Sequence, residues 1–227
     1  MRSAPIRHGS RNAMTAAPPE ARARVAVFAK APVPGQVKTR LATLLGADGA
    51  AALHAGLVRR ALSTAVESRL GPVELWCAPD ATHSFFGRCA EQFGATLHAQ
   101  AGEDLGARMA AAFAHGLAAG DRVVLIGSDC PVLKPQDLRD AALAVAAHDV
   151  ALAPAEDGGY VLVALSRALP GLFEGVSWGT AAVMAQTRTR IAELGVTWKE
   201  LPMRWDVDRP EDFARLQIEG RLPEVLS

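Results

Sequence analysis

Short segments rich in β-branched residues alternate with alanine-rich segments of helical period along most of this chain, and this alternation limits the possible folds more than any other feature. Strands that are separated by helices usually lie parallel in one sheet, with helices covering both faces. The segment 122–127 is almost entirely aliphatic, as a central strand buried on both faces should be. The sequence therefore predicts an α/β fold with three αβα layers and a mostly parallel central sheet.

Periodicity places the expected elements along the chain. The expected strands are residues 24–29, 73–78, 95–98, 122–127, 150–154, 160–165 and 197–201. The expected helices are residues 47–68, 82–93, 105–118, 135–147, 181–194 and 210–219. No repeat and no proline- or serine-rich linker interrupts residues 24–227, so we expect one domain there, preceded by a disordered leader at residues 1–23.

Composition argues against several classes of partner. Lysine and arginine together number 24, as do aspartate and glutamate, so the balanced charge gives no support for binding to nucleic acid or to an anionic membrane. No apolar run approaches the ~20 residues that a bilayer-spanning helix needs, and residues 1–23 lack the hydrophobic segment of a secretory signal. The three cysteines have neither disulfide nor zinc spacing, so we expect a cytoplasmic location. Nothing in the sequence indicates an oligomeric state.

The loop after the first expected strand is stiff and basic. Lys30 ends the strand, and Lys38 and Arg40 stand just before a helix. Pro34 restricts the backbone, whereas Gly35 permits a turn that other residues resist. A stiff loop with cations near the start of a helix suits phosphate. The loop matches neither of the common glycine-rich phosphate motifs, and a solvated connector with surface charges is the alternative interpretation.

Three aspartates are candidate ligands of a divalent cation. Asp129 directly follows the aliphatic segment 122–127, and its simplest alternative is an Asx-type turn before Pro131. Asp206 and Asp208 alternate, so in an extended segment they would point to the same side. Asp208 also fits a helix cap in the sequence Asp-Arg-Pro-Glu, and the cap competes with a ligand role. Magnesium and manganese prefer such oxygen ligands and leave positions open for phosphate oxygens.

The position of these segments in the sheet decides whether they can form one site. In an open α/β sheet, ligands bind at the carboxyl ends of the strands where the strand order reverses. If strands 24–29 and 122–127 are neighbours, the basic loop and Asp129 face one crevice. This adjacency is a prediction that the structure can test.

Two further segments carry candidate binding residues. Asp157-Gly158, between two expected strands, is a strong hairpin signal, and with Gly159 it would also let a substrate approach the backbone closely. Trp178 could stack on a base or a sugar, but core packing is the commoner fate of a tryptophan. Thr180 fits an N-cap of the helix expected from residue 181.

Arg108, in the expected helix 105–118, is a further candidate binding residue. Asp104 is the expected cap of this helix. Arg108, one turn further on, is either a surface residue or an anion contact.

Taken together, these segments resemble those of the radical-SAM/selenodomain-associated transferases, bacterial members of the nucleotide-diphospho-sugar transferase (GT-A) superfamily. The segment 28–41 resembles the first motif of that family and is specific. Further matches follow in the same order at 104–109, 127–131, 157–160 and 206–208. The resemblance covers almost everything after residue 24. One departure is Gly179, where the family usually has serine, so any hydroxyl role at that position is lost.

The resemblance implies a GT-A fold, with a nucleotide site over the carboxyl edge of the sheet. It implies Mg²⁺ or Mn²⁺ at Asp129, with Asp208 as the favoured second ligand and Asp206 as a substitute. Asp129, Asp157 and Asp208 are the expected catalytic residues, and Asp157 and Asp206 are the candidates for a general base. The expected phosphate-binding residues are Lys30, Pro34, Gly35, Lys38, Arg40 and Arg108. The expected acceptor-binding residues are Gly158, Gly159, Tyr160, Trp178 and Thr180.

Three functions fit such a site. The first is glycosyl transfer from a nucleotide-activated sugar donor to a small-molecule acceptor. The second is nucleotidyl transfer, in which a substrate attacks the α-phosphorus of a nucleoside triphosphate and pyrophosphate leaves; Lys38 and Arg40 resemble the triphosphate loop of such enzymes, including the guanylyltransferases. Both reactions depend on positioning and on stabilising a leaving diphosphate. The third is a non-catalytic nucleotide-binding protein.

Overall fold

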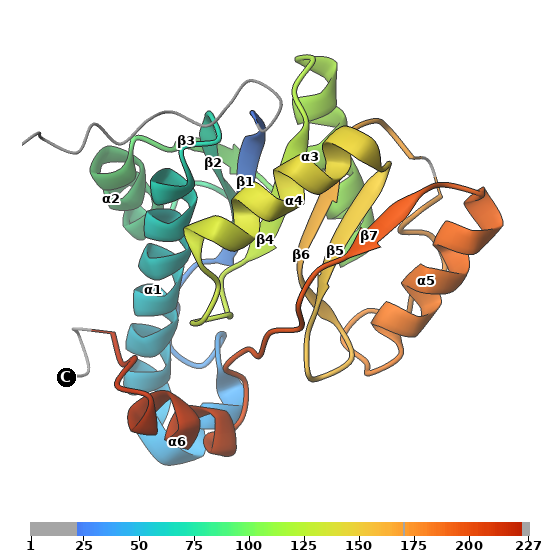
Figure 1. Cartoon of the computed structure of the whole chain (residues 1–227). Coiled ribbons are helices and arrows are strands. Elements are labelled where there is room, and N and C mark those ends of the chain that lie inside the picture. Colours follow the sequence, from blue (N-terminus) through green and yellow to red (C-terminus); the bar gives the residue numbers. More distant parts are fainter. Residues whose placement is uncertain (1–21, 170, 224–227) are drawn as a thin grey trace, which may run out of the picture.

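The computed structural model describes residues 22–169 and 171–223, and a seven-stranded sheet in the order β3-β2-β1-β4-β6-β5-β7 forms its centre (Figure 1). The strands are β1 (Arg24–Lys30), β2 (Val73–Ala78), β3 (Thr96–Ala99), β4 (Val123–Gly127), β5 (Val150–Pro154), β6 (Tyr160–Leu165) and β7 (Trp198–Glu200). All neighbouring strands pair in parallel except β6, which runs antiparallel to both β4 and β5.

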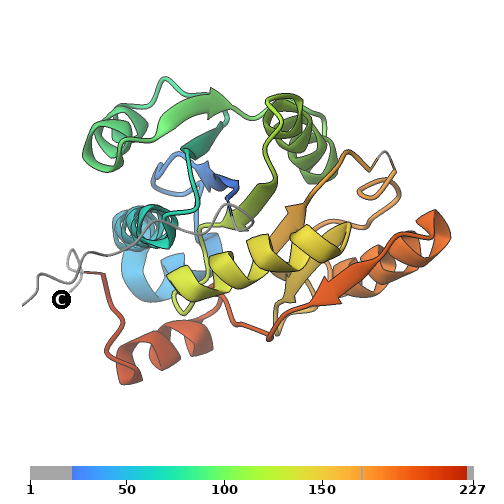
Figure 2. The same cartoon turned by 45° about the horizontal axis from the view of Figure 1, so that its top comes forward.

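Helices cover both faces of this sheet (Figures 1 and 2). One face packs against α1 (Ala42–Ser68), α2 (Ser84–Phe93) and α4 (Pro135–Ala147). The opposite face packs against α3 (Leu105–Ala118) and α5 (Val183–Leu194). A third apolar cluster joins α6 (Pro210–Ile218) to α1 and to the short 3-10 helix η2 (Thr39–Leu41). The predicted three-layer αβα fold with a mostly parallel sheet is therefore confirmed.

Strands β1 and β4 are neighbours, as predicted. Their register pairs Phe28 with Gly127, so the two strands end at the same edge of the sheet. In β1 the residues from Val25 to Ala29 are buried, and in β4 those from Val123 to Ile126, as expected of apolar residues in central strands. The loop after β1 and the loop after β4 therefore leave the sheet side by side.

The reversal at β6 comes from a tight turn. Asp157 lies between β5 and β6, and its Oδ1 accepts a hydrogen bond of 2.8 Å from the amide of Gly159. Gly158 has φ +90°, a backbone conformation that residues with a side chain rarely adopt. The predicted Asp-Gly hairpin is confirmed, and it converts an otherwise parallel sheet into a mixed one.

Several boundaries differ from those expected. Helix α1 includes a short segment that begins at Ala42, but Gly46 has non-helical backbone angles (φ 71°, ψ 168°), so two helical segments meet at a kink there, and the longer one follows Gly46 as the expected start at residue 47 requires. Helix α5 begins at Val183, so the prediction that Thr180 is its N-cap is wrong; Ala182 holds that position. The expected leader lies outside the described residues except for its last two, and of these Ala23 is buried and its amide donates to Leu70.

Helix α1 corrects one expectation about length. Together with η2 it forms a stretch, Thr39–Ser68, that is long and apolar enough to cross a membrane by length and composition alone, although no such run was expected from the sequence. Half of its most apolar window is buried inside the protein, where Val58 and Leu62 pack against the sheet. Core helices of folded domains commonly meet the same criterion.

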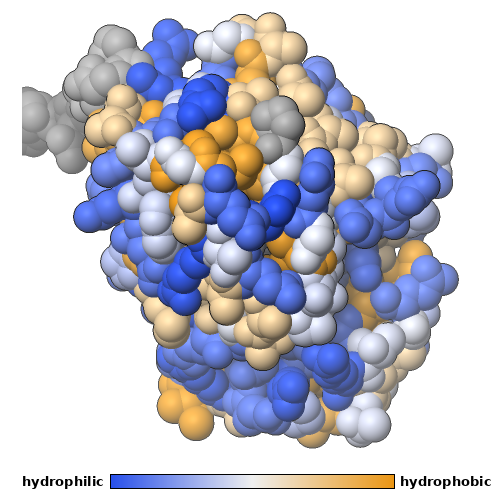
Figure 3. Space-filling view, turned by 90° about the vertical axis from the view of Figure 1, so that its right-hand side faces the viewer, coloured by the Kyte–Doolittle hydropathy of each residue, from blue (hydrophilic) through white to orange (hydrophobic). Residues whose placement is uncertain are grey.

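The side of the molecule that carries α5 and β7 is mainly hydrophilic, with smaller hydrophobic areas between the polar groups (Figure 3). Arg188 of α5 donates from Nη2 to both carboxylate oxygens of Glu200 in β7, at 3.0 and 2.9 Å. This exposed ion pair links α5 to β7, the last strand of the sheet.

The turn at Gly158 predicts a large cost of adding one methyl group. A Cβ at this position would lie 2.3 Å from the carbonyl oxygen of Ala181, and the positive φ adds strain. We expect Gly158→Ala to lower the free energy of unfolding by at least about 2 kcal/mol, measured by chemical denaturation. The matched control is Gly87→Ala in α2, where a Cβ would meet nothing within 4 Å. That variant should be neutral or slightly stabilising, and equal effects of the two changes would contradict this account of the turn.

Candidate active site

Asp129 lies beside the segment that contains Asp206 and Asp208. The amide of Val207 donates a hydrogen bond of 2.9 Å to the backbone carbonyl of Asp129. This bond joins the loop after β4 to the chain that leads into α6, and both segments lie below the sheet near the loop after β1 (Figure 1). The structure thus brings together acidic residues that are almost eighty positions apart in the sequence.

Lys38 joins the basic loop to this acidic pair of segments. Its Nζ lies 2.9 Å from Asp129 Oδ1 and donates a hydrogen bond of 2.5 Å to the carbonyl of Val207. The side chain is only 4% exposed, so these two partners satisfy an ammonium group that water does not reach freely. Lys38 also has a left-handed backbone, with φ 48°, and Gly35 has φ 77° in the same loop.

The charge state of Asp129 is set by its neighbours. Burial acts to raise the pKa of this carboxyl group, but Lys38 and His54 outweigh burial and hold the pKa below its ordinary value. His54 of α1 is buried, its Nδ1 lies 3.7 Å from Asp129 Oδ1, and its Nε2 lies 3.0 Å from the carbonyl oxygen of Lys30. Asp129 is therefore a carboxylate across the physiological pH range.

His54 was not expected to belong to the site. The only signal in the sequence is a titratable side chain directly after Leu53, on the helix face that the structure buries. Such a position is usually apolar. A histidine there needs a polar partner. The carbonyl of Lys30 at the end of β1 supplies one for Nε2, whereas Nδ1 faces Asp129 at 3.7 Å and has no hydrogen-bond partner among the described residues.

Asp206 differs from Asp129 in its electrostatic surroundings. Burial, Asp157 and Asp129 raise its pKa to about 6, and Lys38 only partly opposes them. Three carboxylates therefore crowd one region that holds too little positive charge. A divalent cation would relieve this repulsion, and carboxylate oxygens are the ligands that Mg²⁺ and Mn²⁺ prefer. The chemistry of these carboxylates therefore suits such an ion, although among the described residues they do not form a group of three with ligand atoms within 4.8 Å of one another.

Asp208 is paired with Arg40. Its Oδ2 accepts a hydrogen bond from Arg40 Nη1, so an exposed cation of the basic loop lies against the third aspartate. The prediction that Asp208 caps the last helix is wrong. Arg209 is the N-cap of α6, and the carboxylate of Asp212 accepts from the amides of Asp208 at 3.0 Å and Arg209 at 2.7 Å. The Asp208 side chain is left free of capping because the helix begins at Pro210, as expected, and the residue directly before it, Arg209, holds the N-cap position.

A cleft of about 510 Å³ runs along these residues. Lys30, Lys38, Arg40 and Arg108 all line it, together with Asp129 and Asp208. Arg108 is fixed by a hydrogen bond of 3.1 Å from its Nε to the carbonyl of Gly102, and Asp104 caps α3 as predicted, with Oδ1 2.7 Å from the amide of Ala107. Pro34 and Gly35 are exposed on the loop and are not among the lining residues.

A second cavity of about 480 Å³ adjoins the first and shares Lys30, Arg40, Asp129 and Asp208 with it. Its remaining walls bring together four of the five residues expected to bind an acceptor, Gly159, Tyr160, Trp178 and Thr180, with the expected catalytic residue Asp157. Gly158 shapes the turn behind this wall and is not among the lining residues.

Trp178 serves both interpretations offered for it. It packs against Phe173, with ring centroids 6.4 Å apart, and meets the ring of Tyr160 edge-on at 6.3 Å. Its indole Nε1 is buried and has no hydrogen-bond partner among the described residues. Burial raises the pKa of Tyr160, so its phenol stays neutral. Tyr160 and Trp178 therefore form an aromatic part of a lining that is otherwise aliphatic and polar.

The strand order and the cleft at the carboxyl ends of β1 and β4 define the fold class: it is the α/β fold of nucleotide-diphospho-sugar transferases and nucleotidyltransferases. The chain belongs to the DUF2064 family, described as "uncharacterized protein conserved in bacteria", whose family model matches residues 61–180. None of the curated proteins matches this chain.

Solved structures support the assignment of the fold class. A protein from Desulfovibrio desulfuricans G20, provisionally described as a nucleotide-diphospho-sugar transferase, is 32% identical, with 82% of each chain covered and a TM-score of 0.74. The inositol-1-phosphate CTP transferase of T. maritima is 12% identical over 90% of this chain and 97% of its own, with a TM-score of 0.55. Rv0371c of Mycobacterium tuberculosis H37Rv, in complex with manganese, is 19% identical over 86% and 97%, with a TM-score of 0.51. The last two similarities concern the fold alone.

The crowding around Asp206 predicts a gain in stability when its charge is removed. The folded-state pKa of about 6 exceeds the ordinary value of 3.8, so the ionised carboxyl group destabilises the fold above about pH 6, and the cost disappears as the pH falls toward 3.8. In the metal-free protein we expect Asp206→Asn to raise the free energy of unfolding by about 1–2 kcal/mol at pH 8 and by almost nothing near pH 4.

Chemical denaturation at both pH values, with a chelator present, measures this effect. The neighbouring Asp208→Asn is the control, because Asp208 has Arg40 as a partner and should show no such gain. A pH-independent effect of Asp206→Asn would contradict the assigned cause.

Proposed function

We propose that this protein is a divalent-metal-dependent transferase that uses a nucleotide-activated donor, with glycosyl transfer as the leading reaction. The observation that carries the proposal is the meeting of Asp129 and Asp208 with the cations of the basic loop at one cleft. Asp206 lines an adjoining hollow with Asp157 and Asp208. These carboxylates could be a structural ion network, but Asp206 has no ion pair among the described residues and its pKa is raised. Perturbed carboxyl groups in a cleft are typical of functional sites.

The cations of the cleft suit the phosphates of the donor. Lys30 and Arg40 are exposed on the loop after β1, and Arg108 enters from α3. Arg40 can leave Asp208 for a phosphate, because an exposed ion pair contributes little. Lys38 also lines the cleft; from a buried position it neutralises Asp129 and joins the loop to the acidic segments, and its contact with phosphate stays a prediction.

A metal ion would be held by Asp129 with Asp206 or Asp208. When bound, Mg²⁺ or Mn²⁺ neutralises the diphosphate that leaves the donor. Rv0371c, which shares the fold, binds manganese, and this similarity supports a divalent ion without identifying it. The protein residues orient the donor, exclude water with the wall of the second cavity and compensate the charge of the phosphates.

The second cavity suits the acceptor. It adjoins Asp129 and Asp208 and is closed by Tyr160 and Trp178, whose rings can pack against a small organic molecule. In glycosyl transfer an acceptor oxygen forms a bond to the anomeric carbon, the bond to the phosphate oxygen breaks, and the nucleoside diphosphate leaves. Asp157 and Asp206 are the candidates to take the acceptor proton; Asp157 lines the second cavity, whereas Asp206 has a pKa raised to about 6.

Nucleotidyl transfer is the second candidate reaction. Here an acceptor oxygen bonds to the α-phosphorus of a nucleoside triphosphate, the bond between the α-phosphorus and the bridging oxygen breaks, and pyrophosphate leaves. The cluster of Lys30, Arg40 and Arg108 favours it, because three cations exceed what a diphosphate requires. The fold similarity to a CTP transferase gives further support. A non-catalytic nucleotide-binding protein is the third candidate.

Three broader inferences accompany this proposal. The order of the motifs supports membership of the radical-SAM/selenodomain-associated group within the superfamily. The free, buried thiols of Cys77, Cys89 and Cys130 favour a reducing compartment such as the cytoplasm. We treat residues 24–227 as one domain, since its sheet collects strands from both ends of that range.

A thermal-shift panel separates the candidate donors. We expect nucleotide sugars to raise the melting temperature in the presence of Mn²⁺ and not in its absence, because ligand binding stabilises the folded state. Stabilisation by nucleoside triphosphates instead, together with pyrophosphate release when acceptors are supplied, would favour nucleotidyl transfer. Tight metal-dependent binding with no turnover across both donor classes would favour the non-catalytic protein.

Asp129→Asn tests the metal assignment. The change keeps the size of the side chain and removes its charge. We expect nucleotide to lose its Mn²⁺-dependent effect on the melting temperature, and any turnover to fall by at least about 100-fold. Circular dichroism should stay that of the folded protein. The matched control is Asp140→Asn on the exposed face of α4, where the carboxylate bonds only to Gln136 at 2.7 Å among the described residues. If Asp129→Asn and Asp140→Asn bind metal and nucleotide equally well, the metal is elsewhere.

A further inference from the structure

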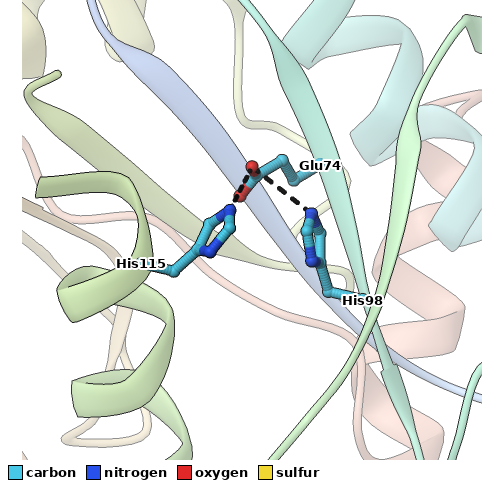
Figure 4. A group of neighbouring side chains, drawn as sticks. All are labelled: Glu74, His98 and His115. Carbon is cyan, nitrogen blue, oxygen red and sulfur yellow. Dashed lines mark ion pairs between the residues drawn. The ribbon is translucent and has the colours of Figure 1, made fainter. Parts of the chain in front are cut away.

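A second group of metal-ligand side chains lies on the face of the sheet that α3 covers. Glu74 of β2, His98 of β3 and His115 of α3 point toward one another (Figure 4). The Nε2 atoms of His98 and His115 lie 3.4 and 3.3 Å from the same oxygen, Glu74 Oε1. Each residue offers one ligand atom, and all three atoms lie within 4.8 Å of one another.

These distances are too long for good hydrogen bonds, whose N···O separation is about 2.7–3.2 Å. They agree with a shared cation. Bond lengths of about 2.0–2.2 Å to nitrogen and oxygen in a tetrahedral site place adjacent ligand atoms about 3.4 Å apart. The Nε2 of His98 is also buried without a hydrogen-bond partner among the described residues, and it points at the gap that a cation would fill.

The groups around the cluster already hold the ligands in place. Glu74 is 2% exposed; its Oε2 accepts from Trp76 Nε1 at 3.1 Å, and its Oε1 accepts from Arg24 at 2.6 Å. The Trp76 ring stacks on His98, with centroids 4.7 Å apart and planes 18° apart. Fixed ligands with such supporting hydrogen bonds are typical of metal sites in proteins.

The charges also permit a cation. Arg24 would repel a metal ion, but it is paired with Asp121 at 2.9 Å as well as with Glu74. Two carboxylates therefore face one guanidinium, and one negative charge is left over for an ion. The side chain of His115 is 47% exposed, which gives the ion a path from solvent and leaves room for a water ligand.

We propose that Glu74, His98 and His115 form a binding site for a first-row transition metal ion, with Zn²⁺ as the best fit. Two imidazoles and one carboxylate suit zinc and its neighbours, whereas Mg²⁺ and Ca²⁺ prefer oxygen ligands alone. The site shares no residue with the lining of the cleft, so this proposal does not rest on the proposed transferase function.

The position of the site in the sheet indicates its role. Glu74 pairs with Ala26, whereas Lys30 at the edge of the cleft pairs with Ala78; four residues of strand separate the two levels by about 13 Å. A metal there joins two neighbouring strands, β2 and β3, to α3. Both β3 and α3 lead to cleft residues, because Gln100 follows β3 and Arg108 lies two turns before His115. A bound ion would thus stabilise the position of one wall of the cleft.

Metal titration of the full chain without an affinity tag tests the site. After treatment with a chelator, we expect calorimetry to show one Zn²⁺ bound per chain, and Co²⁺ to give the visible absorption of a tetrahedral site. His115→Ala and His98→Ala should each weaken Zn²⁺ binding at least about tenfold. The half-exposed His115 can be changed with little risk to the fold, which circular dichroism checks.

Two controls make the result specific. His148→Ala removes a histidine that lies outside the cluster, at the end of α4, and should bind Zn²⁺ like the wild type. Asp129→Asn should also leave Zn²⁺ binding unchanged, which separates this site from the metal of the cleft. Failure of the wild type to bind Zn²⁺ or Co²⁺, or equal binding by wild type, His98→Ala and His115→Ala, would overturn the proposal.

Discussion

The buried contact of Lys38 with Asp129 and the carbonyl of Val207 is the interaction on which the candidate site depends. An ammonium group that is almost fully removed from water is costly unless it is paired and hydrogen-bonded. Here its two partners belong to the loops after β4 and before α6, so satisfying one cation requires three distant segments to meet. The left-handed backbone of Lys38 is one cost of reaching that position. The same contact keeps Asp129 charged. The negative charge of Asp129 in turn helps to raise the pKa of Asp206.

Features that follow from local chemistry could be read from the sequence. The strands, the Asp104 cap and the Asp157-Gly158 turn are all set by residues close together in the chain. Features that depend on packing could not. The N-cap of α6 moves from Asp208 to Arg209 because Asp212, rather than Glu211, reaches back to the backbone. His54 and the Glu74–His98–His115 cluster gain their surroundings only from other elements, so no spacing in the sequence could have indicated them.

Two charged clusters lie at different levels of the sheet, and they differ in the kind of ion that they suit. At the carboxyl ends of β1 and β4, acidic groups outnumber the buried cations and exposed cations line the entrance. Further from this edge, toward the start of β2, Glu74 is surrounded by one guanidinium, an indole and two imidazoles. The first arrangement suits an ion that arrives with phosphates, because oxygen ligands are incomplete without them. The second suits an ion that stays with the protein, because nitrogen ligands and a fixed carboxylate hold it.

The antiparallel course of β6 has a consequence for how such a site can diversify. Since β6 runs against β4, it reaches the edge of the cleft with its first residue, Tyr160, immediately after a tight reversal. One wall of the second cavity is thus built from the beginning of a strand, while the phosphate side is built from strand ends. Changes to the short β5–β6 connection can alter what that wall accepts and leave β1, β4 and the nucleotide side in register. The two halves of the cleft can therefore evolve at different rates within one unchanged scaffold.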